Sequence, residues 1–253
     1  MAESEDGGKS FVASSLISCI VPVFNGERYL RAALDSMPAQ TYRPLEIIVA
    51  DDGSTDGTTA VAASYGEQIF YLRQANVGPA AARNLGLSVA RGEFVAFLDA
   101  DDLWYPKKLA RQMDRFEARQ ELDLCMTFVQ NFWTPELQAA AQLRNHQLMQ
   151  PLPGYPLQTL MAKRALFDTV GQFNPQLRIG DDTDWFLRAA EQRAIMELLP
   201  EVLVYRRFHH TNLTRVRLSE RVHIFKASLD RRRLNKIVSA PLNLLPPAKN
   251  RRT

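Results

Sequence analysis

The sequence has no apolar run that approaches the roughly 20 residues of a membrane-spanning helix. The longest early candidate, residues 16–24, is short and is interrupted by Pro22. The first ten residues, MAESEDGGKS, are polar and acidic, which is not the composition of a signal peptide. We therefore expect a protein of the cytoplasm and not an integral membrane protein.

Cysteine is scarce, and glycine-rich phosphate loops are missing. Cys19 and Cys125 both lie in apolar, strand-like segments, so we expect buried thiols in a reducing compartment rather than a disulfide. The first expected strand is followed by PVFNGE. This segment lacks the G-x-G-x-x-G of dinucleotide dehydrogenases and the Arg-bearing glycine loop of sugar-nucleotide pyrophosphorylases, which argues against both classes.

The chain has 253 residues, 46% of them hydrophobic, which suits one large α/β domain or one domain with an appendage. Its charge is unevenly spread. Of the 31 Lys+Arg and 28 Asp+Glu residues, 13 and 2 lie in residues 206–253, which leaves 18 and 26 for the rest. The acidic body and basic end suggest an anionic partner for the tail, either a membrane surface or nucleic acid.

Strand-like and helix-like segments alternate along the first half. Apolar strands are expected at residues 16–21, 45–50, 69–73 and 94–99, with Pro22 ending the first, and helical spacing recurs between them. Strands that are apolar throughout are typical of a parallel sheet covered on both faces. Further on, we expect a strand at residues 122–133, a helix beginning near Gly180 and a pair of strands within residues 195–207.

Polar clusters follow several of these strands, at the edge where open α/β sheets bind ligands. The strand at 94–99 leads into Asp99, Asp101 and Asp102. In extended backbone, residues two apart point to the same side, so Asp99 and Asp101 can face one Mg²⁺ or Mn²⁺ that carries a diphosphate.

Two other acidic motifs allow two interpretations each. In DDGS, residues 51–54, a carboxylate can accept hydrogen bonds from a base or ribose, or the motif is a polar turn with Asp56 capping the next helix. In GDDTDWFLR, residues 180–188, the carboxylates either cap a helix, with Asp184 and Arg188 as an ion pair, or supply a general base.

Five segments together resemble family 2 glycosyltransferases of the GT-A fold, over residues 18–214. In chain order they are SCIVPVFNGERYL, EIIVADDGSTDGT, NVGPAAARNLGLSVARGEFVAFLDADDLWYP, VGQFNPQLRIGDDTDWFLR and YRRFHHTNLT. The resemblance implies an α/β fold with a mainly parallel central sheet flanked by helices. It also implies an inverting transfer from a nucleoside-diphosphate sugar, most often UDP-linked, to a glycan or lipid-linked saccharide.

The resemblance also implies residue roles. The nucleotide pocket would be lined by Pro22, Val23, Phe24, Glu27, Asp51, Asp52, Arg83, Asp99 and Ala100. Within it, Asp52 would contact the base beside Asp51, and Arg83 would reach the nucleotide. Asp99 would meet the ribose or the metal, and Asp101 would bind Mn²⁺ or Mg²⁺.

By this resemblance, the family's Glu-Asp pair corresponds to Asp181-Asp182 here, which implies that Asp182 would be the base and Asp181 a supporting carboxylate. A histidine would help to hold the metal, and the H-x-x-N spacing to Asn212 favours His209 over His210. A non-catalytic nucleotide-sugar-binding or scaffold protein on the same fold is the alternative function.

The expected organisation is a disordered segment at 1–15, a GT-A domain at 16–214 and a basic helical tail at 215–253. The domain would divide into a nucleotide-binding half, 16–105, and an acceptor and catalytic half, 106–214. In the tail, apolar residues recur at helical spacing within a basic rim, as in a helix that lies on an anionic membrane. The favoured alternative is that this stripe packs on the domain. Nucleic acid is not expected, because aromatic residues are not interleaved with the basic ones.

Overall fold

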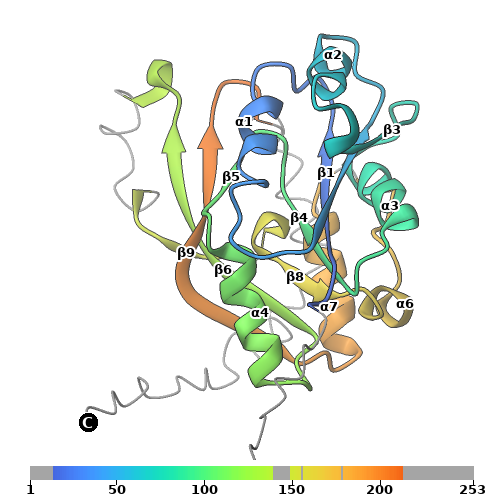
Figure 1. Ribbon diagram of the computed structural model, residues 1–253, viewed down its shortest axis with the longest axis vertical. Coiled ribbons are helices and arrows are strands. Elements are labelled where there is room, and N and C mark those ends of the chain that lie inside the picture. Colours follow the sequence, from blue (N-terminus) through green and yellow to red (C-terminus); the bar gives the residue numbers. More distant parts are fainter. Residues whose placement is uncertain (1–13, 139–148, 155, 178, 213–253) are drawn as a thin grey trace, which may run out of the picture.

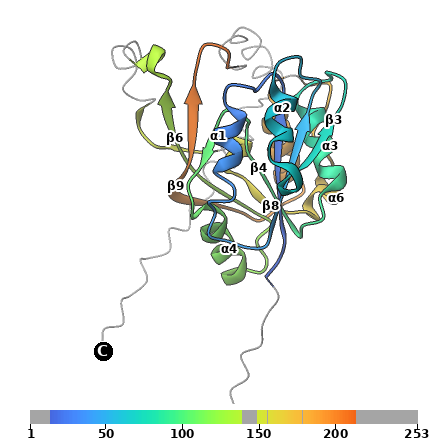
Figure 2. The ribbon, with the colours of Figure 1, turned by 45° about the horizontal axis from the view of Figure 1, so that its top comes forward.

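The computed structural model of the chain describes residues 14–138, 149–154, 156–177 and 179–212. Over these residues, one nine-stranded sheet lies between two layers of helices (Figures 1 and 2). None of the helices in these ranges is long and apolar enough to cross a membrane. The basic tail at 215–253 and nearly all of the segment at 1–15 lie outside the described residues, so the expectations of a disordered N-terminus and a membrane-binding helix stay predictions.

The first half confirms the alternation expected from the sequence. Its four strands pair in parallel in the order β3-β2-β1-β4. In chain order the elements are β1 (Ile17–Val23), α1 (Leu30–Asp35), β2 (Leu45–Asp51), α2 (Thr58–Ala63), the 3₁₀ turn η1 (Gly66–Gln68), β3 (Phe70–Arg73), α3 (Pro79–Val89) and β4 (Phe94–Phe97).

The second half extends the same sheet in the order β4-β8-β6-β9-β5, with β7 paired to β6. Its elements are β5 (Leu103–Trp104), α4 (Lys108–Ala118), β6 (Leu124–Trp133), β7 (Leu152–Pro153), the 3₁₀ turn η3 (Leu157–Thr159), β8 (Met161–Lys163), α6 (Leu166–Val170), α7 (Asp181–Glu191) and β9 (Met196–Phe208). β8 is antiparallel to both β4 and β6, and β9 is parallel to β6. The carboxyl ends of β1, β2, β4 and β9 therefore meet at one edge of the sheet.

Two details of the expected strands are wrong. The pair of strands within residues 195–207 is one long strand, β9, because Pro200 and Glu201 are accommodated as an irregularity in its register with β6 instead of turning the chain. Pro22 does not end the first strand, which runs on to Val23. β4 pairs with β1 only as far as Ile20, so the N–H that proline lacks is not needed there.

Two buried clusters fill the two faces of the sheet. Cys19 and Val21 of β1 pack with α1, α2 and α4, whereas Ile20 packs with α3, α6 and α7. This division follows from the alternation of side chains along a strand. Both cysteines are buried and free, as expected, and burial raises the pKa of each thiol to about 12.

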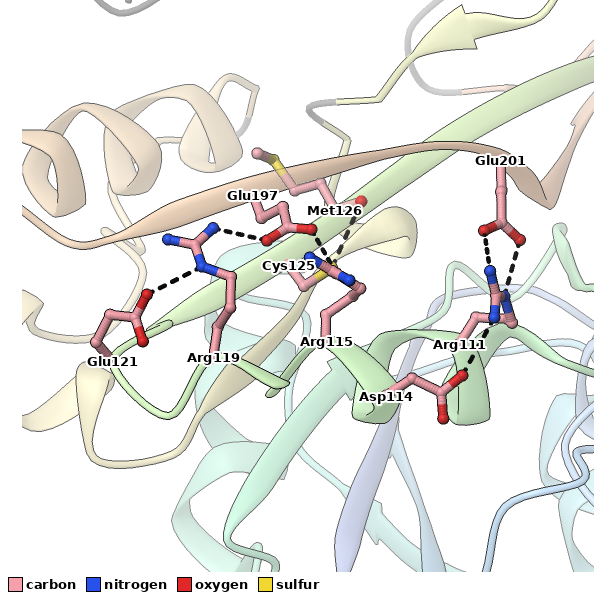
Figure 3. Close-up of polar contacts among 9 residues, drawn as sticks. All are labelled: Arg111, Asp114, Arg115, Arg119, Glu121, Cys125, Met126, Glu197 and Glu201. Carbon is pink, nitrogen blue, oxygen red and sulfur yellow. Dashed lines mark hydrogen bonds and ion pairs between the residues drawn. The ribbon is translucent and has the colours of Figure 1, made fainter. Parts of the chain in front are cut away.

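Ion pairs join α4 to β9 (Figure 3). Arg115 and Arg119 both contact Glu197, at 2.6 and 2.7 Å, and Arg111 contacts Glu201 at 2.6 Å. The arginines lie four residues apart, so they share one side of the helix. These contacts anchor the first half of β9, the strand that is followed by His209.

A lysine that sequence reasoning passed over lies at the start of α4. Lys108 is fully buried, donates to Gln112 Oε1 at 2.8 Å and has its Nζ 4.4 Å from the centre of the Trp104 ring. Burial lowers the pKa of Lys108 to about 7, because a charged ammonium loses its hydration there.

This lysine predicts a specific pH dependence of stability. The folded state releases the proton near pH 7, whereas the unfolded lysine keeps it up to about pH 10. The free energy of unfolding should therefore rise between pH 7 and pH 9, by up to about 1.4 kcal/mol per pH unit from this group. Urea unfolding at several pH values measures it, and Lys108→Met is the control. Parallel curves for the wild type and Lys108→Met would contradict the assignment.

Candidate active site

The carboxylates after β4 lie in a turn. β4 ends at Phe97, and the N–H of Asp102 donates to the carbonyl of Asp99 at 3.0 Å. The expectation that Asp99 and Asp101 share one extended segment is therefore wrong. Each of the two carboxylates instead meets its own set of partners, and Ala100 lies between them, half-buried, at the tip of the turn.

Asp99 meets a buried arginine from α3. Arg83 donates to Asp99 Oδ1 at 3.2 Å and to Asp181 Oδ2. One guanidinium thus joins the turn after β4 to the acidic start of α7. Burial raises the pKa of Asp99, Arg83 opposes this, and the neighbouring Asp101 adds to it. Asp99 is therefore paired with a protein side chain, Arg83.

The acidic pair begins α7. Gly180 precedes it with a φ of 81°, a left-handed conformation that suits glycine, and the helix starts at Asp181. Asp181 is buried against Arg83, whereas Asp182 is half-buried and accepts a hydrogen bond from the N–H of Thr183 at 2.7 Å. Burial raises the pKa of Asp181, again against the charge of Arg83. No lysine or arginine of the described ranges forms an ion pair with Asp182.

Asp101 meets the residues that follow β9. His209 Nε2 lies 2.8 Å from Asp101 Oδ2, and Asn212 Nδ2 donates to the same oxygen at 3.0 Å. The side chain of Asn212 also accepts from the N–H of His209, which explains the H-x-x-N spacing. His209 is buried in this contact, whereas His210 is exposed. The structure thus brings together Asp101 and His209 across more than a hundred residues of chain.

These donors suit a divalent cation in part. Within the described ranges, no three or more His, Cys, Asp or Glu side chains form a cluster that could hold a metal. Asp101 and His209 nevertheless offer an oxygen and a nitrogen within contact of one another. Mg²⁺ and Mn²⁺ accept one or two protein ligands when waters and phosphate oxygens complete the shell. The residues present fit a metal that arrives with a diphosphate.

The aspartates of the DDGS motif, at the end of β2, accept hydrogen bonds from neighbouring protein groups. Asp52 accepts from Gln74 Nε2 and from the N–H groups of Val77 and Gly78, at 2.7 to 3.0 Å. Asp51 accepts from the N–H of Ser54 and from the Tyr71 hydroxyl. Asp52 thus fixes the loop that leads into α3, whereas Asp51 joins its own turn to β3. Contact of Asp52 with a base stays a prediction.

The end of β1 and the residue after it present one exposed aromatic side chain at this edge. Pro22 and Val23 are buried, whereas Phe24 is 49% exposed. Glu27 accepts from the N–H of Gly57, and its own N–H donates to Asp56, so it holds the DDGS loop beside the β1 loop. The exposed Phe24 ring can stack on a planar base.

Arg207 was missed, because in the sequence it counts only toward the basic charge of the C-terminal part. Its Nε donates to the carbonyl of Asp101 at 2.9 Å. Its guanidinium carbon lies 5.0 and 4.6 Å from the ring centres of Tyr29 and Phe132. The doubled arginine two residues before His209 is the signal that could have found it.

Comparison with known proteins shows the family of the chain. The model of the family described as "Glycosyl transferase family 2" matches residues 18–179. An uncharacterized glycosyltransferase of Rickettsia prowazekii is 31% identical over 229 residues, covering 84% of this chain and 70% of its own. One of Rickettsia typhi is 32% identical over 225 residues, covering 82% and 68%.

Solved structures agree at the level of the fold. TarS of S. aureus superposes with a TM-score of 0.64 at 22% identity, over 88% of this chain and 42% of that one. Its residues 1–349 in complex with UDP-GlcNAc superpose with a TM-score of 0.63, also at 22% identity, over 88% and 70%. The sheet and the helices that flank it thus have the GT-A fold. The chain belongs to glycosyl transferase family 2.

Proposed function

We propose that this chain transfers a sugar, with inversion, from a UDP-linked donor to a hydroxyl of a glycan or lipid-linked saccharide. The observation that carries the proposal is the meeting of five acidic or basic side chains at one sheet edge. Arg83 joins Asp99 to Asp181, and Asp101 contacts His209. The fold neighbour TarS binds UDP-GlcNAc, which supports a UDP-linked donor.

The nucleotide would lie over the ends of β1 and β2. Phe24 offers an exposed ring for the base, and Pro22, Val23, Glu27, Asp51 and Asp52 shape the loops around it. Asp99 and Ala100, half-buried at the turn, would face the ribose. Arg83 already neutralises Asp99, and it would approach the nucleotide from the same side.

The diphosphate would lie at Asp101 and His209. A bound Mn²⁺ or Mg²⁺ would neutralise the charge that develops on the leaving diphosphate. Asp101 would hold that cation through Oδ2, and His209 through Nε2, in place of their present contact with each other. Asn212 would keep the carboxylate of Asp101 oriented, because it donates to the same oxygen.

Asp182 would take the proton of the acceptor hydroxyl. A general base needs a carboxylate that can reach substrate and is not already neutralised by a cation. Asp181 is buried and paired with Arg83, whereas Asp182 is more exposed and forms no such pair with the described residues. The oxygen that Asp182 deprotonates would attack the anomeric carbon opposite the leaving diphosphate, which inverts the configuration.

The test is a donor screen. Purified protein with Mn²⁺ should show a raised melting temperature with one or a few UDP-sugars, since a ligand that binds only the folded state stabilises it. The same donors should be hydrolysed slowly to free UDP without an acceptor. Stabilisation only by donors with another nucleotide would overturn the choice of UDP. Binding with no turnover, even with acceptor glycans, would support a non-catalytic sugar-nucleotide-binding role.

A further inference from the structure

The turn after β4 carries a third carboxylate, Asp102, which the proposed reaction does not use. Asp102 is 2% exposed, so it cannot contact a substrate. Burial, together with the charges of Asp101 and Asp99, raises the pKa of Asp102 well above its ordinary value. A buried carboxylate in such a place is costly unless its oxygens are fully used.

Both oxygens of Asp102 are used, and their partners come from two distant elements. Oδ1 accepts from the backbone N–H of Arg207 at 2.8 Å, and Oδ2 accepts from Gln158 Nε2 at 2.9 Å. Gln158 belongs to η3 and is itself fixed in the core, since its carbonyl accepts from Trp104 Nε1. Asp102 therefore ties the end of β9 and the η3 turn to the turn after β4.

The hydrogen bonds of Asp102 also lead to the proposed metal ligands. Asp102 accepts from the backbone N–H of Arg207, and the side chain of Arg207 donates to the backbone carbonyl of Asp101. Two residues after Arg207, His209 contacts the carboxylate of Asp101. Two paths therefore fix the spacing between Asp101 and His209. One runs through Asp102 and Arg207, and the other runs through Asn212, which contacts Asp101 and His209 directly.

We propose that Asp102 is a positioning residue that holds Asp101 and His209 at the separation needed to share one ligand, a divalent cation with its diphosphate. This inference rests on the proposed function. The positioning role depends on the ability of Asp102 to accept hydrogen bonds and not on its charge, because the two partners are a backbone N–H and a side-chain amide. Substitution of a residue that orients a metal ligand through a hydrogen bond typically lowers metal affinity by about 10- to 100-fold.

The experiment is calorimetry of UDP binding with Mn²⁺ and with EDTA, well below the melting temperature of each variant. Asp102→Ala removes both accepting oxygens, and Asp102→Asn keeps an acceptor for the N–H of Arg207 while Gln158 can rotate its amide. Ser18→Ala is the matched control. It removes another buried hydrogen-bonding group, which contacts Glu46 and the N–H of Gly92 near the opposite end of β1.

We expect Asp102→Ala to weaken UDP binding in Mn²⁺ about tenfold or more, with little change in EDTA. Asp102→Asn should stay within about threefold of the wild type, and Ser18→Ala should bind as the wild type does. In the Asp101→Ala background, Asp102→Ala should have no further effect on binding, because it acts through Asp101.

Three results would overturn the inference. They are unchanged binding by Asp102→Ala, an equal loss in Asp102→Asn, and additive losses in the double variant. If wild-type UDP binding is strong but the same in EDTA, the metal is wrong, and the double variant still decides whether Asp102 acts through Asp101. If the wild type does not bind UDP, the proposed function fails, and the inference fails with it.

Discussion

Replacing Asp182 with asparagine should abolish sugar transfer while leaving donor binding almost unchanged. Asparagine keeps the shape of the side chain and its hydrogen bond to the N–H of Thr183, but it cannot take a proton. General base catalysis contributes about 10²- to 10⁴-fold to the rate, so kcat should fall by that factor. UDP affinity by calorimetry should change by less than about twofold, because the loss belongs to the transition state.

Two neighbours on the same helix are the controls. Asp184 lies in the first turn of α7 and pairs with Arg188 at 2.9 Å, so Asp184→Asn should keep kcat. Asp181→Asn removes the charge of one of the two carboxylate partners of buried Arg83 and should lower both stability and donor affinity. If Asp182→Asn stays active and Asp181→Asn loses transfer with intact UDP binding, the base is Asp181.

The carboxylate-rich edge could be predicted because it depends on local patterns. Apolar strands that end in polar motifs predict a parallel sheet with polar residues at its carboxyl ends, and the parallel pairing of β1 with β2 and β4 confirms the sheet. The preference for His209 over His210 could also be predicted from the sequence. The Asn212 side chain accepts from the N–H of His209 three residues earlier, a local contact that spacing can express.

The partners of those carboxylates could not be predicted. Asp99 and Asp101 were expected to face one metal ion. In the structure the chain turns after Phe97, and Asp99 forms an ion pair with Arg83 of α3. Asp102 and Arg207 are 105 residues apart, and no periodicity in a single sequence connects them. Long-range pairing of polar groups is decided by the packing of the whole sheet.

The same limit explains the error at β9. Pro200 sits between two apolar segments, a pattern that is typical of two strands joined by a turn. In the fold, residues on both sides of it pair with the single strand β6, and Glu201 beside it is held by Arg111 of α4. Tertiary contacts on both sides of β9 therefore keep the strand continuous and carry it on to His209.

UDP should bind more strongly with Mn²⁺ or Mg²⁺ than in EDTA, by about 10- to 100-fold, and Asp101→Ala should remove this gain. Without a cation, the carboxylates of Asp99 and Asp101 repel the diphosphate, and Arg83 compensates only for Asp99. A cation held at Asp101 and His209 would reverse the sign of the local charge and so attract the diphosphate.

Calorimetry with UDP, with and without metal, measures the gain directly. Asp114→Ala controls for the loss of one negative charge, since Asp114 lies on the exposed side of α4 and contacts only Arg111 among the described residues. His209→Ala should reduce the gain less than Asp101→Ala, because the carboxylate supplies the negative charge that a hard cation prefers. Equal UDP affinity in EDTA and in Mn²⁺ would contradict the metal role, whereas a gain that survives Asp101→Ala would move the cation to other ligands.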